Sequence, residues 1–314
     1  MSPTETAVAS ATGGPVHSRC PLCNGTARRA FDALDRNRAI SAESFGYARC
    51  RSCGTTFISE PPPDMGRYYE GGYYQFAADG EPNWKTEPRR IQAAAFRVAL
   101  LLRHVAPGVL IEIGAGTGAF ACAVKNAGFD VTAIEMSERC CRYLSEREGI
   151  AAICTDLPLE ALAALPRARA IALWHVLEHL ANPAEVLEQA AAKLEPGGVL
   201  ALAIPNPRSL QFRLLGARWA HLDAPRHLCL MPAEALIREA HKLGLSAVEI
   251  TCSDPDGLEC NFFGWINALR SHPAEGPTPW LAGHAALVVN RLLAPVERTG
   301  NRGAATTIVM RKDQ

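Results

Sequence analysis

Short apolar runs alternate with segments of helical apolar spacing along the chain from residue 109 onward. Runs typical of buried strands lie at 109–113, 131–134, 151–154, 170–174, 199–204, 247–251 and 305–311. Helical spacing is found at 88–105, 119–127, 137–148, 183–194 and 232–243, and Ser137 is a suitable N-cap. Strands that alternate with helices predict a mostly parallel sheet covered by helices on both faces.

The N-terminal part lacks this alternation and is expected to form separate segments. Its first residues are small and polar and are expected to be disordered. Paired cysteines and short strand-like pieces follow, and Pro61-Pro62-Pro63 ends that module. The expected segments are a disordered 1–17, a cysteine module at 18–60, a linker and helix at 61–106, and an α/β domain at 107–314 with a helical insertion at about 257–300.

The composition excludes some classes of function and location. Lys plus Arg and Asp plus Glu both number 32, whereas general nucleic-acid binders usually carry a basic excess, so no nucleic-acid partner is expected. The first residues lack the apolar core of a signal peptide, and we expect a cytoplasmic protein with reduced thiols.

The longest apolar run, 280–295, is broken by His284, Asn290 and Arg291 and is too short and polar to span a bilayer. No transmembrane segment is therefore expected. The run is expected to form a pair of helices that packs over the site or across a dimer, so a homodimer remains open.

Two cysteine pairs in the N-terminal module have the spacing of a metal site. Cys20 and Cys23 form one Cys-x-x-Cys knuckle, and Cys50 and Cys53 form the other. Two such knuckles supply four thiolates for tetrahedral zinc, and a segment this small needs the metal to fold. Four thiolates leave no open coordination position, so a structural zinc is predicted. Incidental cysteines or a redox dithiol are the alternatives.

A glycine-rich turn follows the first predicted strand of the α/β domain. Gly114, Gly116 and Gly118 let backbone amides approach a cofactor where the next helix begins. Glu135 follows the second strand, 23 residues after Glu112, where a carboxylate can accept both ribose hydroxyls. The same glycines fit a dinucleotide-binding pattern, so a nicotinamide oxidoreductase remains an alternative.

An ordered set of motifs resembles one family. These motifs are Glu112-Ile-Gly-Ala-Gly-Thr-Gly118, Ile134-Glu135, Thr155-Asp156, Leu173-Trp-His-Val-Leu-Glu-His-Leu180 and Leu194-Glu-Pro-Gly-Gly198. Together they resemble the class I S-adenosylmethionine-dependent methyltransferases. The cysteine knuckles, Tyr68-Tyr69, Ile204-Pro-Asn206 and Trp219–His227 resemble a bacterial branch with an N-terminal zinc ribbon. The resemblance implies an α/β, Rossmann-like fold with a seven-stranded doubly wound sheet whose last strand is antiparallel, and a small zinc-ribbon module in front.

The resemblance also implies roles for individual residues. The glycine loop would hold the methionine part of S-adenosylmethionine, Glu135 the ribose and Asp156 the adenine, while the end of the fourth strand would face the methyl group. The implied cofactor-binding residues are Glu112, Gly114, Ala115, Gly116, Gly118, Glu135, Met136, Asp156, Leu157, Trp174 and His175.

His175, Glu178 and His179 follow the fourth strand and are candidates for the chemistry. If a helical turn begins at His175, they share one face. A similar Glu-x-x-Glu-His string binds a divalent metal in ubiquinone-pathway O-methyltransferases and small-RNA 3′-end methyltransferases. Here His175 replaces the first glutamate, which disfavours magnesium but suits zinc, iron or manganese. A possible second divalent metal, a histidine general base and a purely structural cluster all remain open.

His227 lies in the loop after the fifth strand and could complete a metal site or contact substrate. The predicted function is methyl transfer to a small-molecule or carbohydrate-like acceptor in the biosynthesis of a secondary metabolite or polysaccharide, with O-methylation favoured over N- or C-methylation. A non-catalytic cofactor-binding zinc-ribbon adaptor is the alternative from another class.

Overall fold

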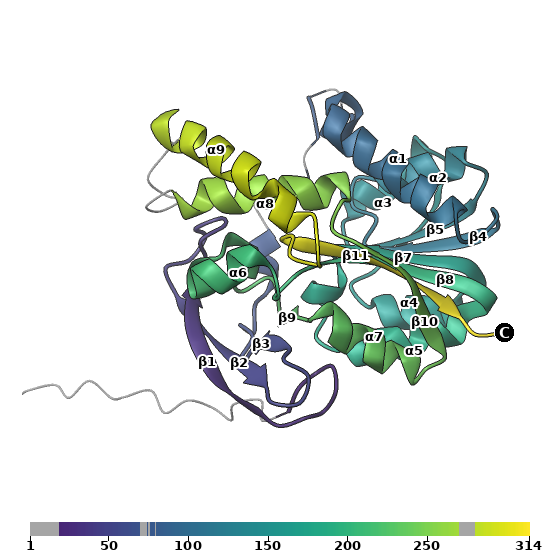
Figure 1. Cartoon of the computed structure of the whole chain (residues 1–314). Helices are drawn as coiled ribbons and strands as arrows, with labels where there is room; N and C mark the ends of the chain where they lie inside the picture. Colours follow the sequence, from purple (N-terminus) through teal and green to yellow (C-terminus); the bar gives the residue numbers. More distant parts are fainter. Residues whose placement is uncertain (1–18, 70–73, 75, 79, 270–279) are drawn as a thin grey trace, which may run out of the picture.

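The computed structural model describes residues 19–69, 74, 76–78, 80–269 and 280–314 (Figure 1). The disorder expected for residues 1–17 concerns a segment outside the described residues. In the described part of the chain, no helix has both the length and the apolar character needed to cross a lipid bilayer.

A seven-stranded sheet forms the centre of the molecule, and its order is β10-β11-β8-β7-β4-β5-β6. Neighbouring strands from β8 to β6 run parallel, and β11 is antiparallel to both β8 and β10. This confirms the predicted Rossmann-like fold with its reversed last strand. The strands are β4 (Val109–Ile113), β5 (Asp130–Glu135), β6 (Ala151–Cys154), β7 (Ala168–Trp174), β8 (Leu194–Pro205), β10 (Leu245–Thr251) and β11 (Ala305–Lys312).

Helices cover both faces of this sheet because successive side chains of each strand point to opposite faces. In β7, Ile171 and Leu173 pack into one core cluster, and Ala170 and Ala172 pack into another. The first cluster includes residues of α4 (Pro158–Ala164), α5 (Pro183–Lys193) and α7 (Ala233–His241). The second includes residues of α1 (Pro88–Leu102), α2 (Ala119–Asn126) and α3 (Glu138–Glu146). Ser137 caps α3, as predicted, by accepting a bond from the Cys140 amide.

A second, four-stranded sheet lies at the carboxyl ends of the parallel strands (Figure 1). Its order is β1 (Ala27–Leu34), β2 (Ser44–Cys50), β3 (Thr56–Ile58) and β9 (Cys229–Leu230), and every pair is antiparallel. The first three strands belong to the cysteine module. The fourth comes from the loop after β8, and the sequence did not predict it.

Between β10 and β11, the residues that the structure describes form α8 (Pro255–Ala268) and α9 (Trp280–Glu297). The run 280–295 was expected to form a pair of helices, and this was wrong because α9 is a single helix with Pro295 inside it. It packs beside α8, where the Trp265 indole donates to buried Glu297 at 3.0 Å. The shorter helices are η1 (Gly66–Tyr69), η2 (Asn83–Thr86), η3 (Leu177–His179), α6 (Leu210–Leu215), η4 (Gly216–Arg218) and η5 (Ala220–Leu222).

Candidate active site

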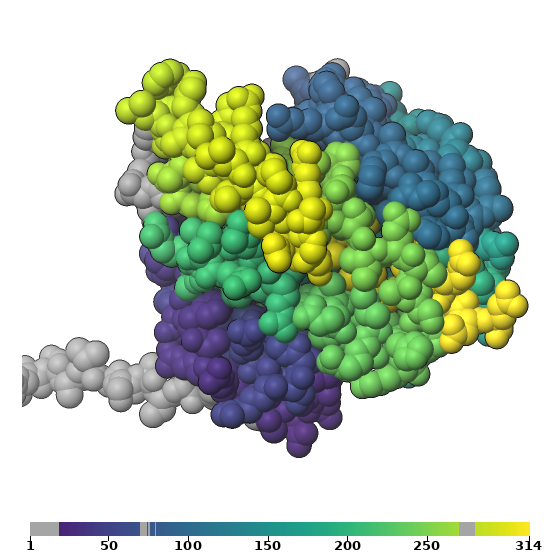
Figure 2. Space-filling model, viewed as in Figure 1, coloured from purple at the N-terminus to yellow at the C-terminus, as the bar shows by residue number. Residues whose placement is uncertain are grey.

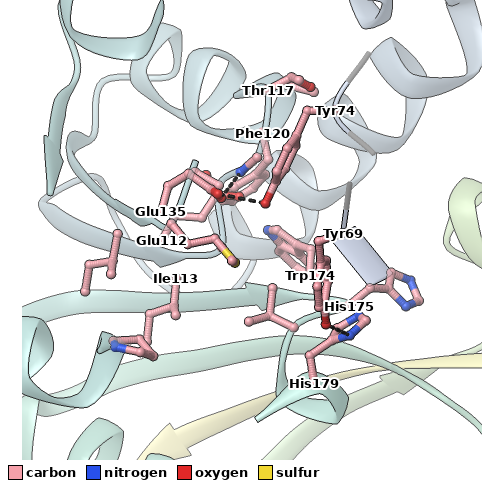
Figure 3. Close-up of a pocket in the computed structure, with 18 of the residues that line it drawn as sticks. Tyr69, Tyr74, Glu112, Ile113, Thr117, Phe120, Glu135, Trp174, His175 and His179 are labelled. Carbon is pink, nitrogen blue, oxygen red and sulfur yellow. Dashed lines mark hydrogen bonds between the residues drawn. The ribbon is translucent and has the colours of Figure 1, made fainter. Parts of the chain in front are cut away.

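A cavity of about 840 Å³ opens at the carboxyl ends of β4, β5 and β7 (Figure 3). This is the edge where open α/β sheets bind their ligands. Most of the predicted cofactor-binding residues line it, namely Glu112, Gly114, Ala115, Gly116, Glu135, Met136, Asp156, Trp174 and His175. Gly118 and Leu157 do not line it, and Thr117 and Phe120 line it although the sequence did not single them out.

The glycine loop is shaped by close packing as well as by backbone conformation. Gly114 and Gly118 adopt φ angles of +73° and +86°, which residues with side chains rarely reach. A Cβ on Gly114 would lie 2.3 Å from Val176, and one on Gly118 would lie 2.5 Å from Leu144. The loop can therefore sit against both neighbours only with glycine at these positions.

Glu135 is held at the edge of the cavity by three donors, of which Figure 3 labels Tyr74. The amides of Gly116 and Ser137 donate to its carboxylate at 2.7 and 2.9 Å, and the Tyr74 hydroxyl donates at 2.8 Å. A carboxylate offers about four acceptor positions, so one remains for a ligand. Sequence reasoning did not predict the Tyr74 contact.

Glu112 is a second carboxyl group beside the glycine loop, and its pKa departs from the usual range. It is 2% exposed, and no hydrogen-bond partner of its Oε2 is found among the described residues. Burial raises its pKa to about 8, the positive charge of Arg97 opposes this rise, and Glu135 adds to it. Arg97 itself lies over the Trp174 ring and pairs with Asp254 at 2.9 Å.

The residues after β7 do not form the α-helical turn on which their predicted common face depended. His175 has a φ of +57°, in the left-handed region, and Leu177–His179 is a 3-10 turn. His175 Nδ1 still lies 3.5 Å from Glu178 Oε1. The close cluster, however, is Glu178, His179 and His227, whose ligand atoms all lie within 4.8 Å of one another.

Backbone carbonyls fix the proton positions in this cluster. His179 Nδ1 lies 3.0 Å from the Arg226 carbonyl oxygen, and His227 Nδ1 lies 2.8 Å from that of His221. Because a carbonyl only accepts, each Nδ1 carries a proton, which leaves Nε2 as the ring atom that faces the rest of the cluster. Burial, aided by the charge of His227, lowers the pKa of His179 to about 4, so that this ring is neutral at pH 7.

Glu178 is fully buried between these rings. Burial favours its protonated form, yet the neighbouring histidines, led by His175, hold the pKa of the carboxyl below its usual range. Neither carboxylate oxygen has a hydrogen-bond partner in the described part of the chain. Glu178 and His227 are not exposed to the cavity, whereas His175 and His179 line it.

The N-terminal module and the linker that follows it form one wall of the same cavity. Asn37, Arg38, Met65 and Tyr69 line it, and the Tyr69 hydroxyl lies 3.0 Å from His179 Nδ1. Among the neighbouring tyrosines, Tyr68 is buried in the core that the module shares with the loop after β8, and Tyr73 lies outside the described residues.

A buried ion network ties this wall to the loop after β8. Arg226 is fully buried and donates to Asp35 at 3.0 Å and to Asp223 at 2.9 Å. Asn37 donates to the same Asp223 at 2.5 Å. Sequence reasoning did not identify these residues, because nothing local shows that Asp35 meets Arg226.

The four cysteines of the module converge on one point. The sulfurs of Cys20 and Cys53 lie 3.6 Å apart, and those of Cys23 and Cys50 lie 3.5 Å apart. All four sulfurs lie within 4.8 Å of one another. This spacing fits four ligands arranged around one zinc ion.

Comparisons with known proteins agree with this geometry. The sequence model of a family described as a methyltransferase domain matches residues 85–250. The ubiquinone biosynthesis O-methyltransferase of Bordetella avium is 28% identical over 124 residues, which are 37% of this chain and 52% of that protein. The enzyme of the same name from Acinetobacter baylyi is 25% identical over 155 residues, covering 45% and 65% of the two chains.

These alignments span about half to two thirds of the length of the curated relatives. Among solved structures, a putative sarcosine dimethylglycine methyltransferase from Galdieria sulphuraria aligns with a TM-score of 0.49 at 15% identity, covering 76% of this chain and 92% of that one. The family match alone covers more than half of the 314 residues. The chain therefore belongs to the family of class I S-adenosylmethionine-dependent methyltransferases.

Proposed function

We propose that this protein transfers a methyl group from S-adenosylmethionine to a hydroxyl group of a small-molecule or carbohydrate-like acceptor. The observation that carries the proposal is a single cavity that contains both a cofactor half and a histidine-lined half. The glycine loop, Glu112, Glu135 and Asp156 form the first, and His175 and His179 lie in the second. The names of the curated relatives, which are O-methyltransferases, support oxygen as the methylated atom.

The residues of the cofactor half fit S-adenosylmethionine. Glu135 keeps an acceptor position for a ribose hydroxyl, and the unpartnered oxygen of Glu112 suits the ammonium group of the methionine part. When bound, S-adenosylmethionine supplies an activated methyl group on a sulfonium. The chain then needs mainly to align the acceptor oxygen with this methyl group and to remove a proton.

His175 is the residue best placed to take that proton. It follows the last residue of β7, its side chain lines the cavity, and its Nε2 is a buried atom that has no hydrogen-bond partner among the described residues. His179 is less suited, because a pKa of about 4 makes it a weak base near pH 7. Its Nδ1 is also committed to the Arg226 carbonyl.

Glu178, His179 and His227 are instead suited to hold a divalent metal. An ionised carboxylate without hydrogen-bond partners is costly to bury, and a cation would offset that cost. Histidine ligands usually donate their second ring nitrogen to a carbonyl or carboxylate, as both rings do here. Such a metal would supply Lewis acidity beside the acceptor. Two imidazoles favour zinc, iron or manganese over magnesium.

The cysteine cluster is proposed to hold a structural zinc. Metal analysis of the purified protein tests both sites without any assay of activity. We expect close to two metal ions per chain, of which Cys50→Ser with Cys53→Ser removes one and Glu178→Ala with His179→Ala removes the other. Full metal content in either double variant would show that the corresponding residues do not bind metal.

The activity itself is tested in two steps. Calorimetric titration should show binding of S-adenosylmethionine and not of NAD. Incubation with panels of phenols, sugars and amines should then yield S-adenosylhomocysteine with a hydroxyl-bearing acceptor. Binding without turnover on any acceptor would favour a cofactor-binding adaptor, and tight binding of NAD would favour an oxidoreductase.

A further inference from the structure

A second cavity of about 630 Å³ lies outside the candidate active site, and the two share no lining residue. It is bounded by β2, by the segment from the end of β8 to α6, and by the loop that precedes β11. Figure 2 shows α6, the N-terminal module and this loop next to one another on one face of the molecule. We call this cavity the arginine cleft, after Arg49, Arg208, Arg213 and Arg302, which line it.

The charge of the cleft is strongly one-sided. Glu234 is the one carboxylate among its described lining residues, and it accepts a bond from Arg208 at 2.8 Å. Arg49, Arg213 and Arg302 form no ion pair with any residue that the structure describes. Three positive charges therefore remain uncompensated at one concave site.

Two of these guanidinium groups lie near the same point beside Gly54. The position that a Cβ would take on Gly54 lies 3.5 Å from Arg208 Nη2 and 3.9 Å from Arg49 Nη2. Arg49 belongs to β2 and Arg208 follows β8, so the fold brings two like charges together from distant segments. Like charges at this range repel each other, and a bound anion would remove that cost.

The walls of the cleft are fixed by buried hydrogen bonds. Asn206 is 1% exposed, and its side chain donates to the carbonyls of Asn301 and Gly303 at 2.8 and 2.9 Å. The same side chain accepts from the Arg208 amide, and the Leu210 amide donates to the Arg302 carbonyl at 3.0 Å. The backbones that carry Arg208 and Arg302 are thus held in place before any ligand binds.

We propose that the arginine cleft binds a phosphate-bearing ligand, a phosphomonoester or a diphosphate group. The planar fork of a guanidinium matches two oxygens of a phosphate, and several forks around one cavity suit an anion with several oxygens. A soluble phosphorylated compound and a phospholipid headgroup share this chemistry. The proposal concerns a site separate from the active site and stands or falls independently of the proposed function.

Calorimetric titration of the whole zinc-loaded protein with inorganic pyrophosphate tests the proposal. Saturation with S-adenosylhomocysteine keeps the ligand out of the larger cavity. We expect binding that weakens as salt is added, with an affinity at least about tenfold lower in Arg213→Ala with Arg302→Ala. Arg213→Lys with Arg302→Lys keeps the positive charges but removes the planar guanidinium groups, and this variant should bind pyrophosphate with intermediate affinity.

The matched control is Arg218→Ala with Arg298→Ala, which removes two exposed arginines that do not line the cleft. This variant should bind pyrophosphate like the wild type. An equal loss in the two alanine pairs would show binding by general surface charge and would overturn the proposal. The same conclusion follows if the wild type binds neither pyrophosphate nor anionic vesicles at low salt.

Vesicle sedimentation separates the two sources of phosphate. If the ligand is a headgroup, phosphatidylcholine vesicles that contain phosphatidic acid, whose headgroup is a phosphomonoester, should sediment together with the wild type, and pyrophosphate should release the protein. Pyrophosphate binding without sedimentation identifies a soluble ligand. Sedimentation that is the same with neutral vesicles and in the Arg213 and Arg302 variants would place the contact elsewhere and contradict the proposal.

Discussion

Two buried glutamates of the candidate site show that neighbouring side chains determine whether a buried carboxyl group is ionised. Glu112 and Glu178 are both almost inaccessible to solvent. Burial dominates at Glu112, where the pKa rises to about 8. At Glu178 the neighbouring histidines, led by His175, outweigh burial, and the pKa falls below its usual range. Only the second is therefore ionised over the whole neutral range.

The raised pKa of Glu112 predicts how stability depends on pH. The folded state binds this proton more tightly than the unfolded state, so the contribution to stability is present below the unfolded pKa of 4.5 and is lost as pH rises towards about 8. Glu112→Gln removes this dependence. Relative to wild type, the variant should gain up to about 1.4 kcal/mol in free energy of unfolding per pH unit within that window.

Urea unfolding of the cofactor-free proteins at pH 5.5, 6.5 and 7.5 measures this difference. Glu138→Gln, on the exposed start of α3, is the control and should show no such trend. A constant difference between Glu112→Gln and wild type would mean that Glu112 is ionised throughout.

Glu135 gives a prediction about the cofactor. Its carboxylate organises the glycine loop through the Gly116 amide and keeps an acceptor position free for the ribose. Glu135→Ala should weaken binding of S-adenosylhomocysteine by about 1.5–3 kcal/mol, the range of hydrogen bonds to charged groups. Calorimetry with Glu138→Ala as control measures it, and unchanged affinity in a folded Glu135→Ala protein would place the ribose elsewhere.

At the scale of elements, the sequence predicts best what local patterns encode. The strands of the large sheet were predictable because Ile171 and Leu173 in β7, like their counterparts in neighbouring strands, lie in continuous apolar runs. The N-cap at Ser137 was also predictable, because its hydrogen bond joins residues that are close in sequence. The predicted set His175, Glu178 and His179 was close in sequence, and the structure brings it together only in part.

What could not be predicted depends on contacts between distant segments. Strand β9 has only two residues, Cys229 and Leu230, which is too short for any periodicity. Its pairing with β3 brings the preceding His227 to Glu178 and the preceding Arg226 to Asp35. The left-handed φ of +57° at His175 likewise could not be predicted from a hydrophobic pattern.

The Arg226 network gives a prediction at the same scale. Arg226→Met would leave Asp35 and Asp223 buried without their cation, which should cost about 3–5 kcal/mol in free energy of unfolding. Adding Asp35→Asn and Asp223→Asn should recover much of this loss, because no uncompensated charge would remain. Denaturant unfolding measures both variants, and equal stability of the single and triple variants would contradict the role of buried charge.

At the scale of the whole molecule, the two sheets share one functional cavity. The large sheet supplies the cofactor half, whereas the wall with Asn37, Arg38 and Tyr69 comes from the cysteine module and the linker after it. A module of this size depends on metal for much of its folding energy. The proposed zinc would therefore stabilise one wall of the cavity, on the acceptor side, without contacting the cavity itself.

This arrangement predicts that loss of the cysteine site acts selectively. Cys50→Ser with Cys53→Ser should speed hydrogen exchange in β1–β3, in residues 35–43 and in η3, since Tyr69 would no longer hold His179. Exchange in β4 and β5 should change little, because their hydrogen bonds lie within the large sheet. Affinity for S-adenosylhomocysteine should accordingly fall less than the rate of methyl transfer. Cys154→Ser, at an exposed cysteine outside the module, is the control. Exchange that rises equally in both sheets would show that the module supports the whole fold, and unchanged exchange at η3 would show that the wall stands without its metal.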